Sequence, residues 1–224
     1  GVRVTDGATL AKKIEHLKDR SVIDFGLGAH FSPDSLKDIG EAMKGGAAFI
    51  KVFTCTTHGV VAVENGFLLA AIKRCADRGV PFLVHAEDES LTRTAEMELR
   101  QAGREDGMVI PEWRSPLAEQ VAVTTVAQLA RATGAPTIVA HCSHPRIVDI
   151  VNEYRARGAS LFAEGCPQYF YLREDEIKEH GAFRKFTPPA RAKTAEDFDA
   201  MWERLRNGSI SYLASDHAPS TRAQ

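Results

Sequence analysis

Four side chains that can bind metal or move protons stand far apart in the sequence, each within or at the end of a short apolar run. Lys51 lies inside the first of these runs, and His85, His141 and Asp216 close three later ones. An amine, two imidazoles and a carboxylate form a set that can hold a divalent metal and exchange protons. Parallel strands that end on one face would bring these groups together. The sequence therefore predicts a metal site built from residues distant in the chain.

Apolar runs alternate with helix-like segments, which indicates βαβ units and a parallel sheet. The predicted strands cover residues 21–29, 47–54, 80–86, 137–142, 159–164 and 210–215. The predicted helices cover residues 64–78, 116–133, 145–157 and 195–206, and residues 89–115 are expected to form a helix followed by an excursion over the strand ends. Six strands cannot close an eight-stranded barrel. Either two further strands belong to a longer parent sequence, or the sheet is open and doubly wound.

Composition narrows the classes of protein. The 224 residues are 44% hydrophobic and 26% charged, with a formal net charge of −2. We expect one domain over residues 1–224, with no electrostatic reason for a nucleic-acid or membrane partner. The 4 cysteines form no CxxC pair, which favours buried reduced thiols and a cytoplasmic location.

Each candidate residue also has an ordinary structural interpretation. Lys51 could extend its ammonium to solvent from a strand end, or it could be kept neutral by burial and react with a carbonyl compound or CO2. His85 and His141 could be satisfied core residues or metal ligands. Asp216 could cap a helix, since Pro219 follows shortly, or it could touch a metal and accept a proton from water.

Six motifs occur in one order along the chain. They are Phe-Ile-Lys-Val-Phe at 49–53, Val-His-Ala-Glu-Asp at 84–88, Ala-His-Cys-Ser at 140–143, Glu-Gly-Cys-Pro-Gln-Tyr at 164–169, Thr-Pro-Pro-Ala-Arg at 187–191 and Ser-Asp-His-Ala-Pro at 215–219. In this order they resemble the cyclic amidohydrolases, the group of dihydroorotases, hydantoinases and allantoinases. The resemblance implies a (β/α)8 TIM barrel of the metal-dependent hydrolase type. The chain would then be a piece of a longer protein, an incomplete barrel with about strands 3–8, without the first two strands and the C-terminal β-sandwich segment.

The resemblance also implies roles for particular residues. Lys51 matches the lysine that carries a CO2-derived carbamate and bridges two divalent metals, expected to be Zn2+. His85 and His141 match ligands of the more exposed metal. Asp216 matches a ligand of the buried metal and the general base. Thr187 falls where the family contacts the substrate ring through its main chain. Arg191 is expected to be an ion-pairing residue beneath the site.

The function expected from the resemblance is hydrolysis of a small cyclic amide, imide or ureide. A hydroxide bridging the metals would attack the carbonyl carbon, with Asp216 taking the proton and passing it to the leaving nitrogen. The resemblance also implies a homo-oligomer, a dimer or tetramer. A non-catalytic scaffold built on the same barrel is the alternative. An open flavodoxin-like domain would need a glycine-rich phosphate loop after a strand, whereas the pair Gly45-Gly46 precedes one.

The family's opening His-x-His motif is absent from these residues, since none of the 8 histidines has that spacing. With two nitrogen ligands missing, we expect these residues alone to bind metal poorly and to turn over little substrate. The motifs that bear on the substrate resemble different members of the family. Gln168 and Tyr169 resemble the hydantoinase pattern, whereas the Ala218 version of the last motif is closer to dihydroorotases.

Overall fold

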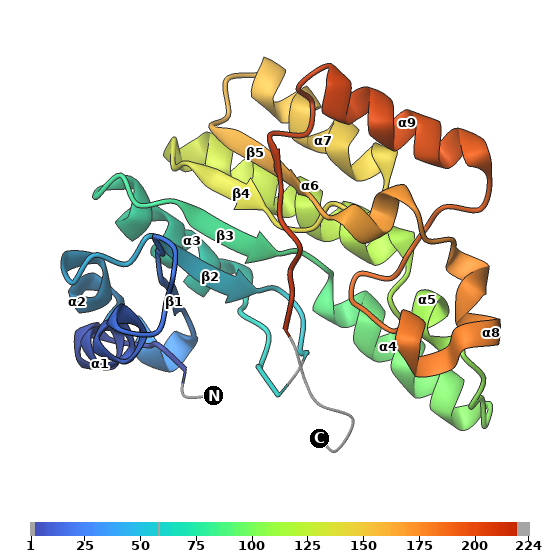
Figure 1. Cartoon of the computed structure of the whole chain (residues 1–224), viewed down its shortest axis with the longest axis horizontal. Coiled ribbons are helices and arrows are strands. Elements are labelled where there is room, and N and C mark those ends of the chain that lie inside the picture. Colours follow the sequence, from blue (N-terminus) through green and yellow to red (C-terminus); the bar gives the residue numbers. More distant parts are fainter. Residues whose placement is uncertain (1–2, 58, 219–224) are drawn as a thin grey trace.

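A six-stranded parallel sheet runs through the molecule, and its strands follow one another in chain order (Figure 1). The computed structural model describes residues 3–57 and 59–218. The strands are β1 (Gly28–His30), β2 (Phe49–Phe53), β3 (Phe82–His85), β4 (Thr137–Val139), β5 (Leu161–Gly165) and β6 (Tyr212–Leu213). A doubly wound sheet would reverse its strand order at a switch point. No reversal occurs among these strands, so the order is that of a barrel with an open side between β1 and β6.

Helices cover the outer side of this sheet and extend past its ends (Figure 1). The helices are α1 (Gly7–Lys18), α2 (Ile39–Lys44), α3 (Asn65–Ala76), α4 (Glu89–Gln101), α5 (Val109–Trp113), α6 (Pro116–Thr133), α7 (Pro145–Ala156), α8 (Ile177–His180) and α9 (Ala195–Arg206). Short 3-10 turns stand at Pro33–Ser35, Pro167–Phe170, Glu174–Glu176 and Gly181–Arg184. The four predicted helices correspond to α3, α6, α7 and α9, and those predictions are confirmed.

Helix α6 shows why these predictions hold. The Ser115 side chain accepts a hydrogen bond from the Ala118 amide at 3.2 Å, and Pro116 occupies the first turn, where its missing N–H costs nothing. Gly134 ends the helix in the left-handed region, with φ of 71°. Val123 and Val126 are buried on one face, so capping and amphipathic spacing specify the same helix.

The N-terminal part of the chain departs from the prediction. The strand expected over 21–29 is wrong for most of its length, because strand pairing begins only at Gly28. Val22 is 98% exposed and Ile23 is 77% exposed, with no neighbouring strand among the described residues. β-branched residues favour a strand only where a partner strand bonds and covers them. Helix α1 was not predicted; it depends on the Asp6 cap and buries Leu10 alone.

The core lies between the outer face of the sheet and the helices. Along β2, Ile50 and Val52 are fully buried towards the helices, whereas Lys51 alternates to the inner face. On that inner face Lys51 pairs with Leu83, and Phe162 of β5 remains 40% exposed. The inner face is therefore where the barrel is incomplete. All four cysteines are buried and unbridged, as predicted.

Candidate active site

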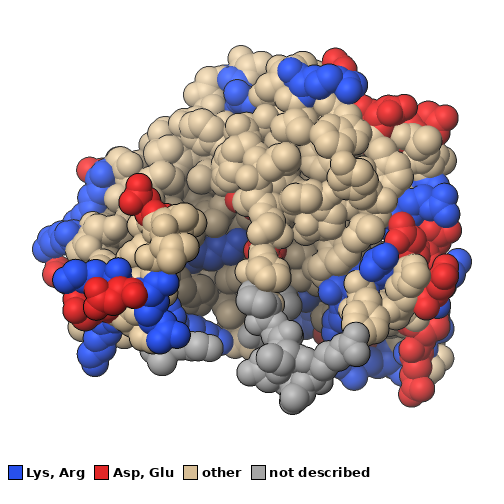
Figure 2. Space-filling view, viewed as in Figure 1, with Lys and Arg blue, Asp and Glu red and all other residues tan. Residues whose placement is uncertain are grey.

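The five predicted site residues surround one cavity at the carboxyl ends of the strands. The cavity has a volume of about 370 Å³. Its lining comprises Lys51, Phe53, His85, His141, Lys185, Phe186, Thr187, Asp216 and Ala218. Figure 2 shows this side of the molecule hollowed, with Lys or Arg side chains inside the hollow. Parallel strands place their ends at one edge of the sheet, which is why residues more than 160 positions apart in sequence meet here.

Two histidines face each other in the cavity wall. His85 is the last residue of β3, and His141 follows β4 by two residues. His85 Nδ1 and His141 Nε2 are 2.8 Å apart, and each residue is 2% exposed. Burial lowers the pKa of both imidazoles, most strongly that of His141, so both rings are neutral at pH 7. Neutral imidazole is the form that binds a metal ion.

Lys51 projects into the same cavity. Burial lowers the pKa of its ammonium group, and the nearby carboxylates of Asp216 and Glu164 only partly oppose that effect. Its Nζ lies 5.1 Å from the centre of the Phe53 ring, and no described carboxylate is within ion-pair distance of it. More of this amine is therefore unprotonated at neutral pH than in an ordinary lysine.

The backbone is strained at two of the predicted residues. Among described residues other than glycine, His141 and Asp216 alone have positive φ, at 39° and 50°. Such conformations cost on the order of 1–3 kcal/mol and occur most often at functional sites. Glu164 supports the first of them, because its Oε1 accepts the His141 amide at 3.0 Å while its Oε2 accepts the Tyr212 hydroxyl at 2.8 Å. Sequence reasoning gave Glu164 no role.

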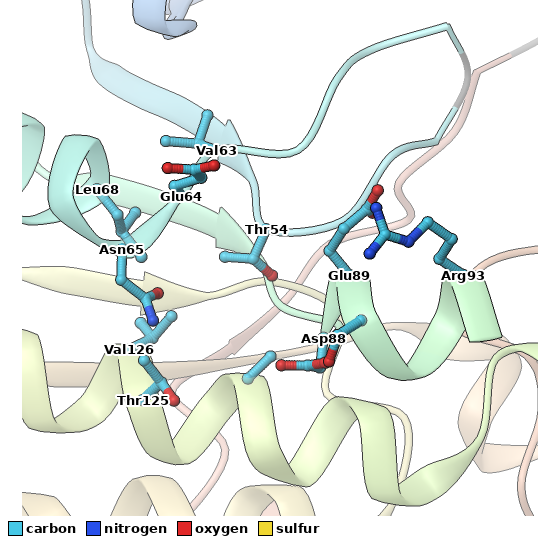
Figure 3. Close-up of a pocket in the computed structure, with 12 residues that line it drawn as sticks. Thr54, Val63, Glu64, Asn65, Leu68, Asp88, Glu89, Arg93, Thr125 and Val126 are labelled. Carbon is cyan, nitrogen blue, oxygen red and sulfur yellow. The ribbon is translucent and has the colours of Figure 1, made fainter. Parts of the chain in front are cut away.

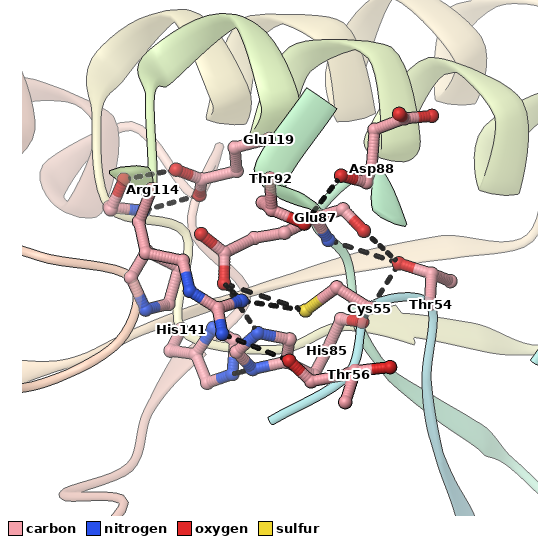
Figure 4. Close-up of polar contacts among 12 residues, drawn as sticks. Thr54, Cys55, Thr56, His85, Glu87, Asp88, Thr92, Arg114, Glu119 and His141 are labelled. Atoms are coloured by element: carbon pink, nitrogen blue, oxygen red, sulfur yellow. Dashed lines mark hydrogen bonds and ion pairs between the residues drawn. The ribbon is translucent and has the colours of Figure 1, made fainter. Parts of the chain in front are cut away.

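A buried ion pair lies directly behind His85 (Figure 4). Glu87 Oε2 is 2.7 Å from His85 Nε2 and 3.0 Å from Arg114 Nη1. Burial alone would raise the pKa of Glu87, but the hydrogen bond from His85 and the charge of Arg114 outweigh it, so the pKa lies below its usual value. Glu87 belongs to one of the six motifs but had no predicted role, and Arg114 was not singled out. A carboxylate two residues after a candidate ligand was the available signal.

A second buried pair lies beneath His141. Glu119 accepts hydrogen bonds from the amide and hydroxyl of Ser143, and Arg191 Nη2 stands 3.6 Å from Glu119 Oε2. The expectation that Arg191 forms an ion pair beneath the site is confirmed. Nearby, the Tyr169 hydroxyl donates to the Pro188 carbonyl at 2.8 Å, which braces the segment that carries Thr187 along the cavity wall.

The residues in the cavity fit a divalent-metal site by their chemistry. Two neutral imidazoles meet through their ring nitrogens, a half-buried amine lies nearby, and Asp216 adds an exposed carboxylate. At 2.8 Å the two ring nitrogens share one proton in a hydrogen bond, and a metal ion bound by both rings would replace that proton. The donor types are those that Zn2+ prefers.

Another cavity, of about 360 Å³, lies among α3, α4 and α6 (Figure 3). The polar side chains that line it form hydrogen bonds within the local structure. Asp88 caps α4 by accepting the Leu91 amide at 2.9 Å, and Glu89 accepts the amide and hydroxyl of Thr56. No histidine or cysteine lines it among the described residues. It therefore lacks the chemistry of the strand-end cavity.

The chain is similar to known proteins over nearly its whole length. No protein-family model matches the chain. Allantoinase from Solibacter usitatus is 30% identical over 220 residues, covering 97% of this chain and 48% of that protein. Dihydroorotase from Halobacterium salinarum is 31% identical over 222 residues, covering 97% of this chain and 49% of that protein. The chain is a homologue of the cyclic amidohydrolases.

The solved structures place the chain within a known barrel. L-Hydantoinase from Arthrobacter aurescens superposes with a TM-score of 0.90 at 28% identity, covering 96% of this chain and 48% of that one. This amidohydrolase homologue therefore spans about half the length of the curated relatives it matches. The predicted fold class, an incomplete barrel of the hydantoinase type, is confirmed. Across residues 3–57 and 59–218, no helix has the length and apolar character needed to cross a bilayer.

Proposed function

We propose that the protein carrying this chain hydrolyses a ring amide in a small cyclic substrate. The proposal rests on one observation: Lys51, His85, His141 and Asp216 converge on one cavity although they are widely separated in sequence. The named relatives, an allantoinase, an L-hydantoinase and a dihydroorotase, support this class of reaction. No observation favours the scaffold alternative, since all four predicted side chains are present and gathered.

Lys51, His85, His141 and Asp216 would hold two divalent metals, expected to be Zn2+. When bound, such metals supply Lewis acidity that lowers the pKa of water and polarises an amide carbonyl. The Lys51 amine, kept partly unprotonated by burial, would bond to the carbon of CO2 and release a proton, leaving a carbamate with two ligand oxygens.

The chain's own residues would move the proton. The carboxylate of Asp216 would accept a proton from the attacking water as the new C–O bond forms. It would return that proton to the ring nitrogen as the C–N bond breaks, which opens the ring to a carboxylate and an amine-type leaving group. The main chain of Thr187 would orient the ring against these groups. A single domain over 1–224, a dimeric or tetrameric assembly and a cytoplasmic location remain predictions.

The test is an Asp216→Asn variant of the full-length protein. We expect turnover of the best substrate among hydantoin, allantoin and dihydroorotate to fall about 10²-fold or more with metal still bound, as for the loss of a positioned acid–base group. Asp199→Asn is the matched control, because Asp199 is exposed on α9 and the chemical change is the same. A near-normal rate in the Asp216 variant would remove that residue from its role.

A further inference from the structure

Glu87 is a fully buried carboxylate directed at the side of His85 that faces away from the cavity (Figure 4). Both residues come from the end of β3 and the loop that follows it. Glu87 Oε2 lies 2.7 Å from His85 Nε2, whereas its Oε1 has no hydrogen-bond partner among the described residues. Oε2 therefore makes all the hydrogen bonds of this carboxylate among the described residues.

Arg114 holds that carboxylate in its charged form. The arginine is also fully buried, and its Nη1 donates to Glu87 Oε2 at 3.0 Å while its Nη2 donates to the Thr56 carbonyl at 3.0 Å. The guanidinium stacks on the Trp113 ring at 4.2 Å. A guanidinium cannot lose its proton in a protein, so the carboxylate beside it stays ionised and can only accept hydrogen bonds.

This arrangement determines where the His85 proton sits. Because Glu87 only accepts, the 2.7 Å contact requires a proton on His85 Nε2. A neutral imidazole carries one ring proton, so Nδ1 is left with a lone pair. That Nδ1 is the atom that faces His141 Nε2 at 2.8 Å in the cavity wall.

We propose that Glu87 is a positioning residue that holds His85 as the Nε2–H tautomer, and that Arg114 acts through Glu87 to keep this bond in place. The lone pair of His85 Nδ1 then lies on the cavity side, where it accepts a hydrogen bond from His141 Nε2 in the metal-free chain. The inference rests on the proposed function only in treating His85 as a metal ligand, because the tautomer itself is a property of the metal-free chain.

A rival arrangement uses the same atoms. Cys55, His85 and Glu87 offer three ligand atoms within 4.8 Å of one another, a spacing that a metal ion can also bridge. Arg114 Nη1, however, lies 2.9 Å from Cys55 Sγ and 3.0 Å from Glu87 Oε2. A guanidinium already supplies the positive charge there, and a second cation would be repelled at that distance. The cluster behind His85 thus supports the ring, and the cavity side receives the ligand.

The experiment is nitrogen-15 NMR of the histidine rings in the full-length, metal-free protein, followed by zinc titration against a chelator. We expect wild-type His85 to carry its proton on Nε2. Glu87→Ala should abolish that preference and weaken zinc binding by about 10–100-fold, the usual effect of losing such a partner. Glu87→Gln should keep the tautomer, because its amide oxygen can still accept from His85. Glu119→Gln, which changes an equally buried glutamate with no contact to His85, should leave tautomer and zinc affinity unchanged.

A wild-type His85 protonated on Nδ1 would overturn the proposal. This measurement needs no variant, so the test holds even if a variant does not fold. A cobalt-loaded protein with a thiolate charge-transfer band that disappears in Cys55→Ser would also overturn it, since the metal would then lie behind His85. If His85 shows the expected tautomer but the protein hydrolyses no cyclic amide, only the proposed function is contradicted. If the protein turns over a cyclic amide but His85 carries its proton on Nδ1, only this inference is contradicted.

Discussion

Two buried glutamate–arginine pairs lie beneath the same cavity and differ in how closely the arginine meets the carboxylate. Glu87 is hydrogen-bonded by Arg114 at 3.0 Å and by His85 at 2.7 Å. Glu119 has Arg191 at 3.6 Å, beyond hydrogen-bond distance, and receives its hydrogen bonds from Ser143 instead.

The two carboxyl groups differ in charge state for this reason. The pKa of Glu87 lies below its usual value, whereas burial raises the pKa of Glu119 to about 7 although Arg191 and Ser143 oppose it. Burial is nearly the same, at 0% and 2% exposure. The distance to the guanidinium and the number of charged donors therefore decide which of the two carboxyl groups is fully ionised at neutral pH.

The largest effect is expected from breaking the tighter pair. Arg114→Met should lower the free energy of unfolding by about 3–5 kcal/mol, because it leaves the Glu87 charge buried without its partner. Denaturant unfolding at pH 7 measures this. Arg191→Met is the matched comparison and should cost less, because Glu119 is already partly protonated at pH 7 whereas Glu87 holds its charge there. Equal losses in the two variants would show that the pairs do not differ as the geometry indicates.

The second prediction concerns pH. Glu119 keeps its proton in the folded state up to about pH 7 but loses it near 4.5 when unfolded. The folded state thus binds more protons in this window, so its stability falls as pH rises from 4.5 to 7. Glu119→Gln should remove a loss on the order of 2 kcal/mol between about pH 5 and pH 7. Unfolding of both proteins at several pH values measures the difference, and parallel curves would contradict it.

The smallest effect is expected at the surface, where a charged pair makes similar contacts in water. Arg100 and Glu96 are 2.7 Å apart on α4, with side chains 77% and 38% exposed. Arg100→Ala should change the free energy of unfolding by less than about 0.5 kcal/mol, because solvent screens exposed pairs. Thermal or denaturant unfolding provides the measurement. A loss as large as that of Arg114→Met would mean that burial is not what separates these pairs.

Much of the fold could be predicted from the sequence because local signals and packing agree. Helix α6 has its cap, its amphipathic face and its terminating glycine in the chain itself. The strand predicted over residues 21–27 was wrong. Their apolar side chains indicate a strand, but a strand forms only where another strand pairs with it. The described residues supply a partner for β1 from Gly28 onward.

The residues that line the candidate site could be predicted from the sequence, but the buried residues that hold them in place could not. Lys51, His85, His141 and Asp216 stand out by residue type at the ends of apolar runs. Glu164 and Arg114 do not, because a charged residue in a sequence is usually a solvated one. Only burial beside a specific partner distinguishes them, and both partners lie more than 20 residues away in the chain.

The sequence by itself determined the parallel α/β order and the identity of the four candidate site residues, because alternation and residue type are local properties. The tertiary structure decided which ring nitrogen of His85 faces the cavity, and which of two buried glutamates is fully charged at neutral pH. Those outcomes depend on distances of 2.8, 3.0 and 3.6 Å between groups that are far apart in the chain. No spacing along the chain encodes such distances, since they arise only when the strands and helices pack together.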